Sequence, residues 1–357
     1  MFVKAEKLTM EKAATGVPRA IQYRTPEFNL LVGRWLKVYE EAFYTQTFSP
    51  IGLPVIAKGM NNYQRADNLR QAAGFFQRPV FLLLDHAKFD SCVHERLLKW
   101  THRQYNKTFR NKFLRFLLSK TLTNRGRSQA GIKYRVRATR MSGDYDTALG
   151  NCMVNYLLLT SWLAGIIHHI LLDGDDSVVV VEYRDLQRLL DTFRHFALMG
   201  FDTELQVVHD LSQVEFCRAR YLDIEPPRFA REWARTLSNW TVANSFVELG
   251  ALRRYLAGIG LGELACNAGV PILGPCARKL ADLSEKPIMQ DKYRYAYGTD
   301  LGPELVSDEA RLAYFNTFGV TVAEQLAIEE EFSPLGERGS PSDFSDIYES
   351  RPWQVSQ

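Results

Sequence analysis

The sequence predicts an α+β protein, in which a mixed sheet is backed by helices and followed by a mainly helical C-terminal region. Strand-like and helix-like segments alternate irregularly before Pro226-Pro227, and beyond these prolines the apolar spacing is helical to about Glu331. At residues 174–176 an apolar run meets a Gly-Asp-Asp turn and a valine run leaves it, which is typical of a β-hairpin.

Apolar periodicity and breaker residues place the elements in order. The expected helices cover residues 34–43, 94–118, 147–164 and 183–199. The expected strands cover 80–84, 132–138, the two arms of the hairpin, and a short strand or hairpin within 213–221. Expected loops cover 58–62 and 126–131, and the Ser-, Pro- and acid-rich segment 333–357 is expected to be loose.

The composition suits a large core or two or three packed subdomains, because 46% of the 357 residues are hydrophobic. The N-terminus lacks the apolar core of a signal peptide, and the most apolar stretch, 154–172, holds too many polar residues for a good membrane span. We interpret this stretch as a buried helix that runs into a buried strand. The five cysteines include no C-x-x-C pair, which favours a reducing compartment without a disulfide framework or a zinc ribbon.

Basic residues are concentrated in one part of a chain whose net charge is only +3. Fourteen Lys or Arg residues lie from Arg96 to Arg140 with no Asp or Glu among them, whereas the C-terminal part is acidic. Such a block indicates a surface for a polyanion. The alternative is a solvated helix face.

Two adjacent carboxylates, Asp175 and Asp176, stand at the predicted hairpin tip, where Gly174 permits the tight turn. Because ionised carboxylates repel each other, the pair calls for a cation such as Mg²⁺ or Mn²⁺. A magnesium site on a hairpin suggests phosphoryl transfer. The alternative is an ordinary solvated turn.

A second acidic group follows the strand expected over residues 80–84. Asp85 ends this strand and can lie beside the hairpin tip, so that Asp85, Asp175 and Asp176 would hold two metal ions. Asp90 lies past the strand and could reach a ribose hydroxyl. For Asp85 alone, the alternative is the N-cap of a helix.

A Ser-Gly turn at Ser142 and Gly143 opens the helix that begins at Thr147. Thr147 and Asn151 are four residues apart, so both project from one helix face and can offer a hydroxyl and an amide to a sugar. The alternative is helix capping by Ser142 or Asp144.

Together and in this order, these blocks resemble motifs A, B and C of the positive-strand viral RNA-dependent RNA polymerases, most of all the tombusvirus-like (carmovirus-like) replicases. Asp85 and Asp90 match motif A, and residues 174–176 match motif C. Arg-Met-Ser-Gly-Asp at 140–144, followed by Thr-x-Leu-Gly-Asn at 147–151, matches motif B with high family specificity.

Further segments extend the resemblance to residues 2–331. Residues 214–217 resemble motif E, residues 18–24 resemble motif F, and residues 2–7 resemble the segment before motif F. The resemblance implies a right-hand fold with a palm of antiparallel sheet backed by helices. The implied divisions are partial fingers 1–79, palm 80–100, a basic fingers insertion 101–139, palm 140–222, thumb 223–332 and an acidic tail 333–357.

The resemblance also implies roles for particular residues. Asp85, Asp175 and Asp176 would be the metal ligands for Mg²⁺ or Mn²⁺. Asp90 and Asn151 would check the ribose 2′-hydroxyl. The nucleotide-binding residues implied are Arg19, Arg24, Asp90, Ser142, Gly143, Thr147 and Asn151, with Lys4, Lys7 or Lys12 assisting at the triphosphate.

The implied reaction is template-directed RNA synthesis that replicates a viral genome, with RNA and ribonucleoside triphosphates as partners. The basic block would line the template and product path. Viral or host replication proteins are further expected partners. We expect work in the host cytoplasm on membrane-associated replication complexes, with the anchor in another segment or a partner.

Three departures from the family pattern stand out. Glu204 occupies the place where motif D usually carries a Lys, and an ionised acid cannot protonate the leaving pyrophosphate; His209 is a candidate substitute. The sequence begins just before motif F, so we expect the N-terminal fingers to be absent or very short, in a fragment, one product of a longer reading frame or a compact relative. Asp173 adds charge before the Gly-Asp-Asp turn.

Two other functions remain open from the sequence. A reverse transcriptase would share the palm, but its turn usually carries an aromatic residue, and Asp90 with Asn151 favours ribonucleotides. A catalytically weakened or inactive RNA-binding protein on a polymerase scaffold is the second, and the motif D departure supports it.

Overall fold

The computed structural model describes residues 1–4, 14–17, 19–128, 131–240, 247–290, 293 and 305–334. The chain divides into two compact units. Unit 1 comprises residues 1–60 and 68–217, and unit 2 comprises residues 61–67 together with the chain from residue 218 onward. The helix α3 (Asn62–Phe75) begins in unit 2 and ends in unit 1.

Unit 1 is built on a four-stranded sheet with the strand order β6-β7-β3-β8. The strands are β3 (Pro79–His86), β6 (His168–Asp173), β7 (Asp176–Glu182) and β8 (Thr203–Val208). Each neighbouring pair is antiparallel, so the expectation of a mixed sheet is wrong, whereas the α+β class and an antiparallel sheet backed by helices are confirmed. All four valines of 178–181 are buried, as the apolar run predicts for a central strand.

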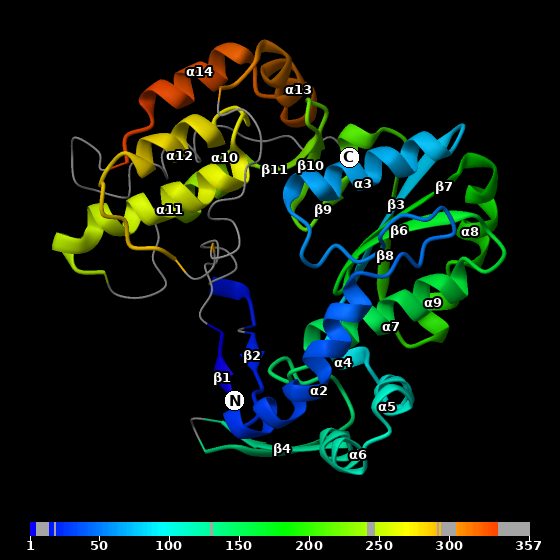
Figure 1. The fold of residues 1–357 in the computed structure, drawn as a ribbon. Coiled ribbons are helices and arrows are strands. Elements are labelled where there is room, and N and C mark those ends of the chain that lie inside the picture. The colour runs from blue at the N-terminus through cyan, green and yellow to red at the C-terminus, as the bar shows by residue number, and fades with distance from the viewer. Residues whose placement is uncertain are drawn as a thin grey trace. The chain divides into compact units, whose positions relative to one another are not determined.

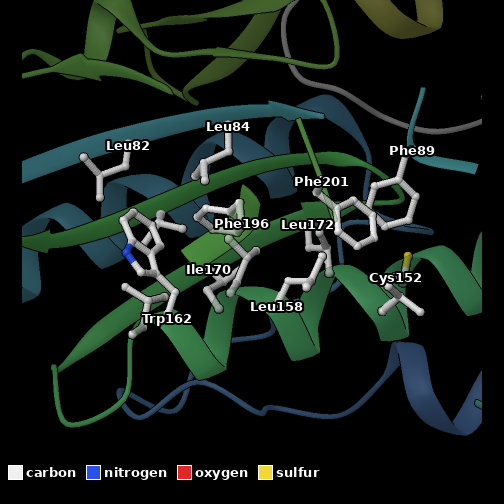
Figure 2. Close-up of a cluster of buried hydrophobic side chains, with 14 of the residues drawn as sticks. Leu82, Leu84, Phe89, Cys152, Leu158, Trp162, Ile170, Leu172, Phe196 and Phe201 are labelled. Carbon is white, nitrogen blue, oxygen red and sulfur yellow. The ribbon is translucent and has the colours of Figure 1, made fainter. Parts of the chain in front are cut away.

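The helix α7 (Thr147–Trp162) covers one face of this sheet (Figure 1). Figure 2 shows Leu158 and Trp162 of α7 pointing toward Leu82 and Ile170 of the sheet, within the main hydrophobic core of unit 1. Burial of these side chains fixes which sheet face is apolar, because a shift of one residue would turn every side chain to the other face. The strand ends that carry the acidic residues are thereby held in register.

Unit 1 contains further elements outside this sheet. They are β1 (Phe2–Val3), β2 (Ala20–Ile21), α2 (Pro26–Tyr44), α4 (Phe89–Cys92), α5 (Glu95–Phe109), α6 (Lys112–Ser119), β4 (Thr123–Arg127), β5 (Lys133–Arg137), α8 (Leu186–Thr192), α9 (His195–Leu198) and β9 (Glu215–Phe216). They include the separate strand pairs β1–β2 and β4–β5. Short 3₁₀ turns cover Lys120–Leu122, Tyr183–Asp185 and Leu211–Gln213.

Several predicted elements need correction. The helix expected over 94–118 is two helices, because Arg110 adopts a left-handed conformation with φ 47° and Asn111 then caps α6. The helix expected over 183–199 is likewise broken into a 3₁₀ turn, α8 and α9. The first two residues of the loop expected over 126–131 belong instead to β4, which pairs with β5 in a hairpin. The sequence interpretation missed β8, a strand of three polar and three apolar residues whose exposure alternates along most of its length.

Unit 2 is mainly helical, as predicted. Its elements are β10 (Ala219–Leu222), β11 (Arg228–Arg231), α10 (Trp233–Trp240), the 3₁₀ turn Leu249–Ala251, α11 (Leu252–Asn267), α12 (Leu273–Ala281), α13 (Asp308–Phe318) and α14 (Val322–Glu331). The strand β10 overlaps the short strand or hairpin predicted within 213–221, whereas its antiparallel partner β11, beyond the prolines, was not expected. A separate hydrophobic core that includes Trp240, Leu256 and Tyr314 holds this unit together.

Three further expectations can be compared with the structure. None of the five cysteines forms a disulfide. Of the described helices, none is both long enough and apolar enough to cross a bilayer. The segment 335–357, which makes up nearly all of the predicted acidic tail, lies outside the described residues.

Candidate active site

The Gly-Asp-Asp segment forms the predicted hairpin turn. Asp173, the last residue of β6, pairs with Asp176, the first residue of β7, which leaves Gly174 and Asp175 as the two central residues of the turn. Gly174 has φ 76°, and glycine is favoured at the first position of such a turn because other residues are strained there. The turn therefore presents Asp175 at the tip and Asp176 on the adjoining strand.

The strand β3 brings Asp85 to the same end of the sheet. Its pairing with β7 runs to Leu84 opposite Ser177, so the next position on each strand is Asp85 and Asp176. Asp85 is exposed and lies within the strand, so it is not a helix N-cap.

The three carboxylates influence one another. Burial raises the pKa of Asp176, and the negative charges of Asp175 and Asp85 raise it further, while a hydrogen bond from the Cys217 thiol opposes the rise. Within the described parts of the chain, no group of three or more His, Cys, Asp or Glu side chains is assembled to hold a metal ion. The charges of Asp85, Asp175 and Asp176 nevertheless repel one another, and a bound cation would relieve this repulsion.

A buried polar network supports the turn from below. Asn155 on α7 donates its amide hydrogens to the carbonyl oxygens of Gly174 and Asp175, at 3.2 and 3.0 Å. Its Oδ1 lies 3.2 Å from Nε2 of His86, and Nδ1 of His86 lies 2.8 Å from the Thr203 hydroxyl on β8. The turn backbone is therefore tied to a helix and two strands.

Sequence interpretation missed both His86 and Asn155. Burial lowers the pKa of His86, despite the hydrogen bond that its ring donates to Asn155 and despite the nearby acids, which favours the neutral ring. The available signal was a single Asn inside the apolar run 152–159, because a buried amide requires partners.

A second set of contacts holds the other side of the hairpin. Lys58 forms an ion pair with Asp173, which accounts for the extra acid before the turn. The backbone of Ala57 donates to the Leu172 carbonyl at 2.8 Å, and Leu172 in turn donates to the Val55 carbonyl at 2.9 Å. The Cys152 sulfur accepts a hydrogen bond from the Gly174 N–H at 3.3 Å.

The two residues predicted to check the ribose are in direct contact. Asn151 Nδ2 donates to Asp90 Oδ1 at 2.7 Å, which joins α7 to α4. Burial raises the pKa of Asp90, an effect opposed by this hydrogen bond and by nearby arginine charges that include Arg19. Asn151 Oδ1 is buried and has no hydrogen-bond partner among the described residues, so one acceptor of the pair is unused.

The Ser-Gly turn packs against the segment that resembles motif F. The Gly143 N–H donates to the Gln22 carbonyl at 3.1 Å, and a Cβ on Gly143 would lie only 2.6 Å from the Tyr23 Cα. Ser142 Oγ accepts from the Gln22 N–H and donates to the Ala20 carbonyl, each at 3.4 Å. Gly143 is therefore required by close backbone approach, and Ser142 does not cap the helix.

The two arginines predicted to hold the triphosphate differ in their surroundings. Arg24 donates to both carboxylate oxygens of Asp144, at 2.6 and 3.3 Å, and also to Asn124. Binding of a triphosphate by Arg24 would thus require an exchange of partners. Arg19 is exposed, and its backbone carbonyl accepts from the Lys4 N–H at 2.8 Å. Lys7 and Lys12 lie outside the described residues.

A buried ion pair stabilises the start of α7. Arg140 donates to Asp146 at 2.7 Å, and the Tyr105 hydroxyl donates to the same carboxylate oxygen at 3.1 Å. A Cβ on Gly150 would lie 2.1 Å from the Arg140 guanidinium, so the glycine makes room for it. The Thr147 hydroxyl donates to the Met141 and Asp144 carbonyls at 3.0 and 2.7 Å, which leaves its oxygen able only to accept from a ligand.

The motif D departure lies next to the acidic residues. Glu204 on β8 is the cross-strand partner of Asp85, and both side chains are exposed. A further acid thus lies beside Asp85, at the position where the resemblance implies a Lys. His209 follows the end of β8 and is exposed. Its ring packs against that of Tyr183, with the two ring centroids 6.0 Å apart.

Comparison with known proteins agrees with this geometry. The viral RNA dependent RNA polymerase family matches residues 1–336. The chain is 32% identical over 355 residues to the RNA-directed RNA polymerase of Turnip crinkle virus, covering 94% of this chain and 45% of that protein. It is 30% identical over 378 residues to the enzyme of Tomato bushy stunt virus (strain Cherry), covering 98% of this chain and 45% of that protein.

A third relative is the RNA-directed RNA polymerase of Groundnut rosette virus (strain MC1), 30% identical over 355 residues that cover 94% of this chain and 42% of that protein. The chain thus spans somewhat less than half the length of these relatives. The match to the family extends over the hairpin, the strand that carries Asp85 and the start of α7 alike, and this chain belongs to the viral RNA-dependent RNA polymerases.

Proposed function

We propose that this chain catalyses template-directed synthesis of RNA from ribonucleoside triphosphates, in the replication of a positive-strand RNA virus. The observation that carries the proposal is the convergence of Asp85, Asp175 and Asp176 at one sheet end, with family membership as independent support. We assign the sheet of unit 1 to the palm and the helices of unit 2 to the thumb.

Asp85, Asp175 and Asp176 would hold Mg²⁺ or Mn²⁺, since oxygen ligands suit these ions; the pKa of Asp176 is raised first by burial and then by the negative charges of Asp175 and Asp85, which a cation would offset. Through such ions these carboxylates would supply the Lewis-acid chemistry that activates a primer 3′-hydroxyl for attack on the α-phosphate and stabilises the departing pyrophosphate oxygen. The hydrogen bonds from Asn155 to the turn backbone hold Asp175 in place, so little reorganisation is needed when substrate binds.

Selection of the ribose would rest on Asp90 and Asn151. The unused Oδ1 of Asn151 can accept a hydrogen bond from a 2′-hydroxyl after a small movement of the side chain. A deoxyribonucleotide would leave this acceptor unpaired, which disfavours its binding. Arg24 would reach the triphosphate by exchanging Asp144 for phosphate oxygens, which present the same bidentate geometry.

One observation favours the alternative of a weakened catalyst that mainly binds RNA. Glu204 faces Asp85 across the sheet, adds negative charge and offers no cationic proton donor. If this residue limits the reaction, Glu204→Lys raises the rate of synthesis.

The test is extension of a labelled primer on an RNA template with four ribonucleotides and Mg²⁺ or Mn²⁺. We expect wild-type protein to make template-length RNA, and Asp175→Asn to lose at least about a thousandfold in rate while retaining RNA affinity. Near-wild-type synthesis by Asp175→Asn would refute the proposal. Normal RNA binding without synthesis by the wild type would support the RNA-binding alternative.

A further inference from the structure

The helices α5 and α6 form a cationic groove that contains none of the residues predicted for the active site. Arg96, Lys99, Arg103 and Lys107 of α5 line an open groove of about 720 Å³, and Arg115 of α6 lies on its other side. All five side chains are exposed. Leu118 and Leu122 also line it and add apolar surface.

The four cations of α5 form a row. They are spaced by three or four residues, which places them on one helix face at steps of about 4.5–6 Å along the axis and over about 16 Å in all. A row of charges at this spacing can follow successive phosphates of one nucleic-acid strand. A single small anion would need cations that converge on one point instead.

The groove has little counter-charge of its own. Lys99 pairs with Glu95 at 2.6 Å, and Arg137 pairs with the same carboxylate at 2.7 Å. Hydrogen bonds from these two cations lower the pKa of Glu95 to about 2. In the parts of the chain that the structure describes, Arg96, Arg103, Lys107 and Arg115 form no ion pair, so their charge is available to a ligand.

The groove lies on a different face of α5 from the contacts that support the active site. Leu97, Leu98 and Tyr105 are buried on the inner face, where the Tyr105 hydroxyl bonds to Asp146 near the start of α7. The basic residues Arg103 and Lys107 lie on the outer face. Removing their charge should therefore leave the helix and the catalytic end of the sheet intact.

We propose that the α5–α6 groove binds the phosphodiester backbone of an RNA strand outside the catalytic path, without reading its bases, in place of the template and product path that the resemblance implies for this part of the basic block. The choice of RNA as the polyanion rests on the proposed function. Charge complementarity and the linear row are the recognition elements, and each occupied phosphate site releases counterions from the RNA. The site raises affinity for long RNA and takes no part in nucleotide transfer.

The test compares Arg103→Ala/Lys107→Ala with Arg184→Ala/Arg194→Ala in the full chain. The second variant removes the same charge from two exposed arginines of unit 1 that do not line the groove. The probe is a fluorescently labelled single-stranded RNA, with its Kd measured from 50 to 200 mM salt. The rate of synthesis is measured against RNA concentration, and vesicles containing phosphatidylserine form a separate arm.

We expect the groove variant to bind RNA about tenfold more weakly at ~0.1 M salt, with a salt slope reduced by about 1.4, which is ~0.7 for each lost phosphate contact. Its rate at saturating RNA and its KM for nucleotides stay at wild-type values, and the control variant is unchanged. An unchanged RNA Kd and salt slope would overturn the proposal, as would loss of vesicle binding with RNA binding intact.

A lower rate at saturating RNA would also overturn it, because the groove would then belong to the catalytic path. The proposed function and the groove can fail separately. If the wild type makes no RNA and the groove variant still loses RNA affinity, the groove proposal survives and the polymerase proposal fails. If synthesis is normal and the groove variant binds RNA like wild type, only the groove proposal fails.

Discussion

The acidic end of the sheet and the basic α5–α6 groove are two regions of one unit with unbalanced charge of opposite sign. At the sheet end, burial and then the negative charges of Asp175 and Asp85 raise the pKa of Asp176. In the groove, Arg103 and Lys107 stand in a row without acidic partners among the described residues. Each region is suited to a ligand that supplies the missing charge.

The two regions differ in how their charges are held. Neutral buried groups fix the acidic turn through hydrogen bonds, with Asn155 and His86 as the links to α7 and β3. The groove cations are long exposed side chains held only by their helix. Chemistry on a reacting phosphate needs fixed geometry, whereas attachment to a backbone of any sequence needs charge and reach. A balanced pair such as Arg140 and Asp146 instead serves the fold.

Beyond the acidic residues themselves, the largest expected effect comes from removing the Asn155 amide, which holds the backbone of the acidic turn. Asn155→Ala is expected to lower the rate of RNA synthesis 10- to 100-fold (about 1.4–2.7 kcal/mol) and to raise the Mg²⁺ concentration needed for half-maximal rate. The reason is that the Gly174 and Asp175 carbonyls lose their shared donor and His86 loses a partner. Steady-state synthesis across a Mg²⁺ titration measures this.

The matched control is Ser161→Ala, which removes a polar group from the same helix away from the turn. Thermal unfolding of both variants separates loss of stability from loss of positioning. If Asn155→Ala leaves the Mg²⁺ dependence unchanged and lowers only the Tm, the network is structural and the contrast between the two regions is lost.

A second test concerns His169, a buried histidine on β6, the first strand of the hairpin. Burial, followed by the neighbouring charge of His168, lowers the pKa of His169 to about 3, and its ring nitrogens lie 2.7 Å from Asn68 and 3.0 Å from Ser49. The folded pKa is below the ordinary value of 6.5, so the unfolded chain binds the proton first as the pH falls. Stability from the neutral ring is complete above pH 6.5 and is lost toward pH 3.

Between pH 7 and pH 5 this residue alone is expected to cost about 2 kcal/mol of unfolding free energy. His169→Gln cannot take up the proton, so its stability should fall by about 2 kcal/mol less over the same range. Denaturant unfolding at both pH values measures the difference. Equal losses in the two proteins would contradict the assignment of a neutral buried His169.

The smallest expected effect concerns the contact between Asn151 and Asp90 near the acidic turn. Asn151→Ala removes the amide bonded to Asp90 and should relax the preference for ribonucleotides about tenfold, or ~1.4 kcal/mol. Competition between a ribonucleotide and its deoxy form in primer extension measures the ratio. An unchanged ratio would mean that the pair positions α4 and α7 without contacting the sugar.

Local signals made much of this site predictable. The hairpin followed from Gly174 between two apolar runs, and Asp85 from the end of a buried strand, because each depends on a few neighbouring residues. The support for the turn was not predictable in the same way, since His86 and Asn155 are 69 residues apart and meet only after the sheet and α7 pack.

The break between α5 and α6 escaped prediction for a different reason. Arg110 adopts a left-handed conformation that its side chain disfavours, and the apolar spacing continues across it. The strand β8 was missed although Glu204 and Gln206 alternate with apolar residues, because the alternation covers only a few positions and little of the strand is buried. Antiparallel pairing with β3 stabilises β8 as a strand, although its own composition favours a strand only weakly.

The central claim is that the acidic turn performs the chemistry and the basic groove supplies RNA affinity. The most direct test measures the rate of RNA synthesis against RNA concentration for wild type, Asp175→Asn and Arg103→Ala/Lys107→Ala. We predict that Asp175→Asn synthesises RNA at least about a thousandfold more slowly at every RNA concentration, despite a wild-type RNA Kd. The groove variant should reach the wild-type plateau at about tenfold higher RNA concentration. A lowered plateau in the groove variant, or near-wild-type synthesis by Asp175→Asn, would contradict the account.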